Sequence, residues 1–137
     1  MSRSGYSDDC DGWGLIRWRG AVQSAIRGKR GQAFLREMLA ALDALPEPRL
    51  IDGAMVRDDG VCALGAVAKS RRMNVGDLDV YEQEDVAEAF GIARAMAAEI
   101  AYENDERRYE SPEHRFQRIR AWVAGKIRAE VSDVARR

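Results

Sequence analysis

The sequence is poor in the residues on which secreted folds and zinc sites depend. Its 137 residues include only two cysteines, one histidine and three prolines. Two cysteines do not make the disulfide framework of a small secreted domain, and Cys62 lies in an apolar run typical of a buried free thiol. The single histidine, His114, has no partner at the Cys–His spacing of a zinc site. We therefore expect no metal site.

Long apolar runs are absent as well. No stretch approaches the roughly 20 apolar residues that a membrane span needs, and the N-terminus lacks the apolar core of a signal peptide. The length suits one domain with a core of its own. We expect a cytoplasmic protein with no membrane partner.

Known catalytic motifs are missing too. The chain has no G-x-S-x-G elbow, no H-E-x-x-H pair and no phosphate-binding loop, because Arg27–Gly31 has the wrong spacing and no strand before it. His114 falls in the first turn of a predicted helix, where exposure is the usual outcome. We predict a non-enzymatic protein with no catalytic residue and no cofactor.

Helical periodicity dominates what is present. Two amphipathic stretches, 13–27 and 32–45, are separated by a Gly-bounded loop, which predicts an N-terminal αα-hairpin. Turn signals at Asp58-Asp59-Gly60 predict a small β-hairpin, and small residues from Cys62 onward favour a closely packed short helix. Further helices are predicted over 82–90, over 93–103 and from Ser111-Pro112 onward, with an exposed loop at 104–108.

The predicted fold class is therefore mainly α, with a minor β component. We expect a five-helix single domain over residues 12–137, with the N-terminal αα-hairpin and one small β-hairpin, preceded by a flexible tail at 1–11.

Charge is nearly balanced overall but segregated along the chain. The net charge of −1 gives no global basic field, yet no acidic residue occurs between Gly12 and Arg36, whereas twelve lie between Asp77 and Glu113. Single-sign patches steer association with partners of opposite charge. The candidate partner-binding residues are basic ones near the N-terminus and acidic ones further on: Arg17, Arg19, Arg27, Lys29, Arg30, Glu99, Glu103, Asp105 and Glu106. The alternative is that both sets are solvated surface that pairs within the chain.

A second function is open at this point. The packing skeleton of residues 86–100, with a small Ala87 and then Gly91 before apolar residues, matches a helix-turn-helix and would make the protein a DNA-binding transcriptional regulator. The second helix offers Arg94 but also Glu99 and Glu103, whose charge would repel phosphates.

Four stretches together resemble small uncharacterised accessory proteins encoded by proteobacterial phages and prophages. They are WRGAVQSAIRGKRGQAFLREMLAALDALP, DGVCALGAVAKSR, VAEAFGIARAMAAEIAYENDE and HRFQRIRAWV, and the likeness covers most of residues 13–123. It carries no assigned activity. It implies a phage protein that occludes a host nucleic-acid-handling or defence complex, as an anti-CRISPR inhibitor does. The expected partner is a host protein or nucleoprotein complex; nucleic acid at the basic stretch and a homodimer are alternatives left open.

Overall fold

The computed structural model describes residues 12–107 and 109–129, which form six helices and one two-stranded sheet. The elements are α1 (Gly12–Arg27), α2 (Lys29–Asp43), β1 (Val56–Arg57), β2 (Gly60–Val61), α3 (Ala63–Arg71), α4 (Gln83–Phe90), α5 (Arg94–Asp105) and α6 (Pro112–Lys126). The mainly helical class with one small sheet is confirmed. The six helical segments predicted one by one, including the short one after Cys62, are all present, so the predicted total of five was one too low. The predicted tail at 1–11 lies outside the described residues.

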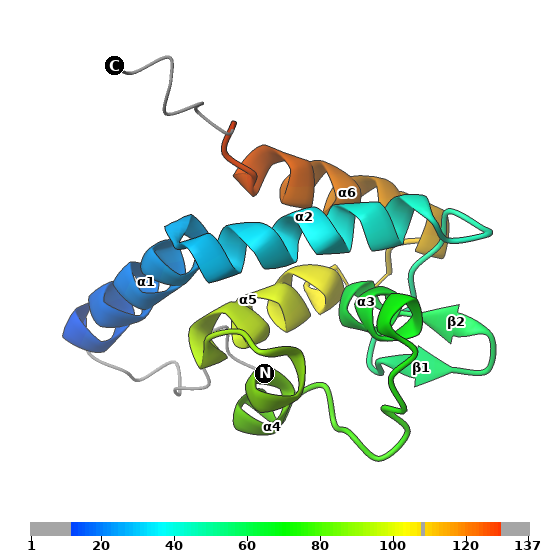
Figure 1. Cartoon of the computed structure of the whole chain (residues 1–137), viewed down its shortest axis with the longest axis horizontal. Coiled ribbons are helices and arrows are strands. Elements are labelled where there is room, and N and C mark those ends of the chain that lie inside the picture. Colours follow the sequence, from blue (N-terminus) through cyan, green and yellow to red (C-terminus); the bar gives the residue numbers. More distant parts are fainter. Residues whose placement is uncertain (1–11, 108, 130–137) are drawn as a thin grey trace.

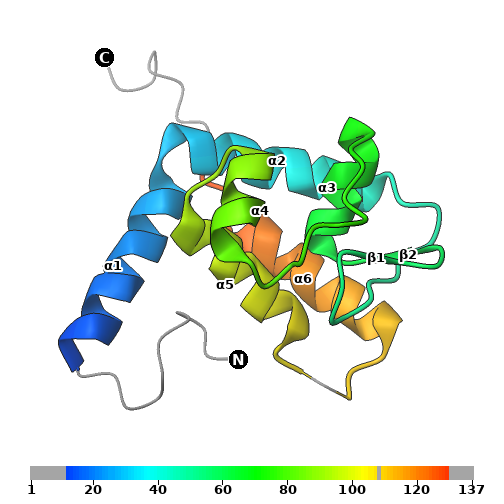
Figure 2. The same ribbon diagram turned by 90° about the horizontal axis from the view of Figure 1, so that it is seen from below.

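Helices α1 and α2 do not fold back on each other as the predicted hairpin would. One residue, Gly28, joins them, and they meet at a wide corner in both views (Figures 1 and 2). The two backbones come close together at this corner, since a Cβ on Gly31 would lie 1.9 Å from the carbonyl oxygen of Ala25. Without a longer loop the chain cannot reverse, so α1 packs on α5 while α2 packs on α3 and α6. The αα-hairpin prediction is thus corrected to an open corner.

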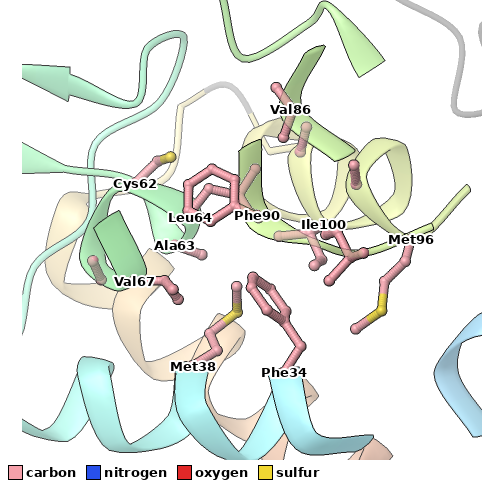
Figure 3. Close-up of a cluster of buried hydrophobic side chains, with 14 of the residues drawn as sticks. Phe34, Met38, Cys62, Ala63, Leu64, Val67, Val86, Phe90, Met96 and Ile100 are labelled. Carbon is pink, nitrogen blue, oxygen red and sulfur yellow. The ribbon is translucent and has the colours of Figure 1, made fainter. Parts of the chain in front are cut away.

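The main core lies between α2, α3, α4 and α5 (Figure 3). Phe34 from α2 meets Phe90 from α4 edge to face, with ring centroids 6.0 Å apart. The Arg71 guanidinium lies over both rings, 5.6 and 5.8 Å from their centroids. Its charge is held by Glu37 on α2, to which Arg71 donates two hydrogen bonds of 2.7 and 2.6 Å. Aromatic packing and this ion pair together join α2, α3 and α4.

The predicted β-hairpin is present. Val56 pairs with Val61 in an antiparallel ladder, and Asp58 adopts a φ of 56°, the left-handed conformation that a two-residue turn requires. Ile51 N–H donates to the Val61 carbonyl at 2.9 Å, so the segment before the hairpin extends the pairing. The hairpin lies against the start of α3 (Figure 1).

Helix α5 continues beyond its predicted end. Asn104, expected in an exposed loop, is 2% exposed inside the helix. Its side-chain oxygen accepts from Ala63 N–H at 3.1 Å and its amide donates to the Ile51 carbonyl at 2.9 Å. Asn104 thus satisfies backbone groups of two other segments, which favours a helical position for it over an exposed loop. By contrast, the predicted start of the last helix is confirmed: the Ser111 side chain caps the His114 N–H, with Pro112 next.

Among residues 12–107 and 109–129, no helix has the length and apolarity that crossing a bilayer demands.

Candidate interaction surfaces

The basic face, Arg17, Arg19, Arg27, Lys29 and Arg30, lies on α1 and at the α1–α2 corner. All five side chains are exposed. Within residues 12–107 and 109–129, none of the five side chains makes a hydrogen bond or an ion pair. The structure therefore places the predicted basic residues along α1 and on the first turn of α2, exposed to solvent.

Apolar side chains accompany this charge on the same helix. Trp13 is 71% exposed and Ile16 is 60% exposed. They lie on the side of α1 opposite the buried stripe of Trp18, Val22 and Ile26, as the 3.6-residue period requires. An exposed tryptophan beside arginines is the residue combination found at the energetic centres of protein interfaces. The helical period thus separates Trp18, which is buried, from Trp13, which is exposed.

The predicted acidic residues, Glu99, Glu103, Asp105 and Glu106, lie in a different setting. Asp105 accepts hydrogen bonds from Gly53 N–H and from the Tyr81 hydroxyl. Burial and the hydrogen bond to this carboxylate raise the pKa of Tyr81. Glu103 lies 3.9 Å from Arg118, with only 14% of its side chain exposed. Much of this set therefore holds the end of α5 to its neighbours and is less accessible than the prediction supposed.

A second acidic surface was not singled out from the sequence. The acidic face of α4 consists of Glu82, Glu84, Asp85 and Glu88, all exposed. The signal is present in the sequence, since Glu84, Asp85 and Glu88 fall on the side of the helix opposite Val86 and Phe90. Glu84 and Asp85, in the first turn, also complement the helix dipole.

The polar cluster at the start of α6, Glu110, His114, Arg115 and Arg118, was missed entirely. Arg118 donates to both carboxylate oxygens of Glu110 at 2.8 and 2.9 Å, and His114 Nδ1 lies 2.6 Å from the same carboxylate. The Arg118 hydrogen bonds outweigh burial, so the pKa of Glu110 falls to about 2. Arg115, with a side chain 3% exposed, donates to the carbonyls of Leu50, Arg107 and Glu110.

This cluster brings the only histidine onto a buried carboxylate, which is one requirement of acid–base chemistry. However, the Glu110 side chain is 3% exposed and committed to Arg118, whereas the His114 side chain is 59% exposed. Neither residue lines the groove between the end of α2, the β-hairpin and the end of α3. What the arrangement does is fix the loop before α6 to the helix.

A groove of about 910 Å³ lies between the end of α2, the β-hairpin and the end of α3. Its lining mixes apolar side chains such as Ile51 and Met73 with charges of both signs, among them Arg49 and Asp59. Its carboxylates, on Glu47, Asp58 and Asp59, share the lining with the cations of Arg49, Arg57 and Lys69.

Neither cysteine chemistry nor metal binding finds a place in the described structure. Burial raises the pKa of Cys62 to about 12, so its thiol stays protonated, and its sulfur accepts from Gly65 N–H at the start of α3. In the part of the chain that is described, no three His, Cys, Asp or Glu side chains gather as metal ligands would.

The helix-turn-helix alternative meets a geometric obstacle. Helices α4 and α5 do join at Gly91, whose φ is 72°, as that motif requires. Yet α5 contacts α1, α3, α4 and α6, so it has no free side with which to enter a groove of DNA. Its one exposed cation, Arg94, is engaged by Gln83 at 3.1 Å and lies 3.9 Å from Glu84.

No protein-family model matches the chain, and comparisons with curated proteins and with solved structures also give no match. The functional argument therefore depends on the surfaces described above.

Proposed function

We propose that this protein is a non-enzymatic binding protein that docks the α1–α2 corner onto an anionic surface of a nucleic-acid-handling complex and thereby occludes it. The observation that carries the proposal is the basic face: five exposed cations along α1 and on the first turn of α2, without a pairing partner among the described residues. The resemblance to phage accessory proteins is the ground for naming a bacterial defence complex, as for an anti-CRISPR inhibitor.

The basic face is better suited to bind a partner than the predicted acidic residues Glu99, Glu103, Asp105 and Glu106. The cations of the basic face are exposed and have no ion pair with a described residue, so binding would not break one. Glu103 and Asp105, by contrast, would have to give up contacts with Arg118 and Gly53. Their common sign accelerates encounter with an anionic partner, and Trp13 supplies the apolar anchor that charge alone lacks. Binding through this face predicts affinity that falls steeply with salt.

The test is affinity capture of the tagged protein from a bacterial lysate, with and without nuclease, followed by mass spectrometry. The informative variant combines Arg17→Glu, Arg27→Glu and Lys29→Glu. Its matched control combines Lys69→Glu and Arg72→Glu, two exposed cations at the end of α3. We expect wild type and control to retain the same nucleic-acid-handling complex and the triple variant to lose it. Equal recovery by all three would exclude the basic face.

The DNA-regulator alternative is separated by the same proteins. Duplex DNA binding that survives the triple reversal but is lost on Arg94→Glu would assign the activity to the α4–α5 unit. Loss of capture on nuclease treatment would show that nucleic acid, not a protein surface, is what the basic face contacts.

A further inference from the structure

Two oppositely charged surfaces lie on helices that pack on the same neighbour, and within the described residues only Glu84 among their members pairs with an opposite charge. The basic face lies on α1 and the acidic face on α4, and each of these helices packs on α5 (Figure 2). No ion pair joins them within the described residues: Glu84 approaches only Arg94, and Glu82, Asp85 and Glu88 make no side-chain contact with a cation. Packing on α5 holds the two faces apart, so within the described residues of one copy they do not neutralise each other.

Exposed aromatic side chains border both faces. Trp13 begins α1, and Tyr81, 38% exposed, comes just before α4. Few large apolar side chains are exposed elsewhere in the described residues, and the combination of aromatic, arginine and carboxylate groups is that of a protein interface with a polar rim. The two surfaces are thus alike in composition and opposite in sign.

We infer that a second copy of this chain covers the basic face with its acidic α4 face. In a dimer with two-fold symmetry, α1 of each copy contacts α4 of the other. The same contact therefore occurs twice, and it pairs the charges of both faces in both copies. The dimer is held by charge around the aromatic anchors and dissociates as salt rises, because these groups are solvent-exposed. It goes beyond the proposed function and regulates it: the basic face is sheltered until an anionic partner displaces the second copy.

Sedimentation velocity on the purified full-length protein tests this, over a concentration series in about 0.1 M and about 1 M NaCl, between which the Debye length falls from about 10 to about 3 Å. We expect wild type to be dimeric at low salt and monomeric at high salt. Variant X carries Arg17→Glu, Arg27→Glu, Lys29→Glu and Arg30→Glu, and variant Y carries Glu84→Lys, Asp85→Lys and Glu88→Lys. Each alone should weaken the dimer by about tenfold or more, because like charges then face each other.

The decisive arm is the mixture. X has two acidic faces and Y two basic faces, so X and Y should form a heterodimer although neither self-associates. A matched control, Glu47→Lys with Asp59→Lys at the groove, should dimerise as wild type does. Circular dichroism melting checks that every variant is folded. A wild type that stays monomeric at low salt, or an X–Y mixture that stays monomeric, overturns the inference, as does a dimer that X and Y both retain.

Failure here is distinguishable from failure of the proposed function. Variant Y keeps the basic face, so it should capture the host complex at least as well as wild type. Dimerisation without any capture would reject the proposed function alone, and capture by a strictly monomeric wild type would reject the dimer alone.

Discussion

Arginines at the α1–α2 corner and at the start of α6 have opposite surroundings. Arg17 and Arg27 are exposed and pair with none of the described residues, whereas the buried Arg115 and the partly buried Arg118 are held by carbonyls and Glu110. A guanidinium presents a rigid fork of hydrogen-bond donors, which can bind acceptors inside the protein or acceptors of a partner. Charge near the N-terminus is therefore available for binding, and charge near α6 is committed to structure. Four predictions break or sharpen this contrast.

The largest effect is expected at Arg115. Changing Arg115→Met removes three hydrogen bonds to buried carbonyls and a guanidinium whose Nε lies 3.8 Å from Glu110. We expect the free energy of unfolding, measured by urea denaturation, to fall by about 3–5 kcal/mol. Arg17→Met serves as the matched exposed change and should alter it by less than about 0.5 kcal/mol. Similar losses for both would abolish the distinction between the two regions.

Acid should unfold the protein partly through Glu110. Its pKa in the folded protein is about 2, below the ordinary glutamate value of 4.5. A carboxylate whose pKa is lowered by folding stabilises the protein above its unfolded pKa, and this stabilisation is lost as pH falls from about 5 towards 2. We expect a loss on the order of 2–3 kcal/mol from this group. In Glu110→Gln this part of the pH dependence of the unfolding free energy should be absent; an unchanged profile would contradict the role of Arg118.

Two glycines of the N-terminal helices should respond in opposite directions to alanine. Gly31→Ala places a Cβ against the Ala25 backbone and should cost about 1–3 kcal/mol. Gly20→Ala meets nothing within 4 Å on exposed helix and should stabilise by about 0.5–1 kcal/mol. Thermal melting of the two variants measures both signs. A harmless Gly31→Ala would show that the close corner does not set the direction of α1.

The smallest effect on stability is expected at Trp13. Because its side chain is 71% exposed, Trp13→Ala should change the unfolding free energy by less than about 0.5 kcal/mol. The same change should weaken capture of the partner and self-association, both of which use that side chain as an anchor. Trp18→Ala, which removes a buried indole, should instead destabilise the fold by about 3–5 kcal/mol. Comparable melting losses for both would mean that Trp13 belongs to the core.

Local signals predicted most of the helices and turns. Ser111 and Pro112 begin α6, Gly91 ends α4, and Asp58 takes the left-handed turn, because each acts through its own backbone or its nearest neighbours. Predictions failed where distant segments decide. Asn104 appears loop-forming in sequence, yet buried groups of Ala63 and Ile51 keep it in α5.

Candidate sites divide in the same way. The basic face was predictable, because Arg17 and Arg27 fall on the side of an amphipathic helix opposite its apolar stripe. The acidic set was predicted from sequence density, which does not register that Asp105 binds Tyr81 while Glu88 faces solvent. Whether a charged side chain is committed or available depends on which segment packs beside it.

The sequence by itself determined the mainly helical class, the small hairpin and the segregation of charge, since periodicity and turn chemistry act over a few residues. Only the tertiary structure decided that α1 projects from a one-residue corner and that Arg115 is buried while Arg17 is not. The physical reason is that burial and pairing are set by contacts between segments far apart in the chain, such as Arg115 with Leu50.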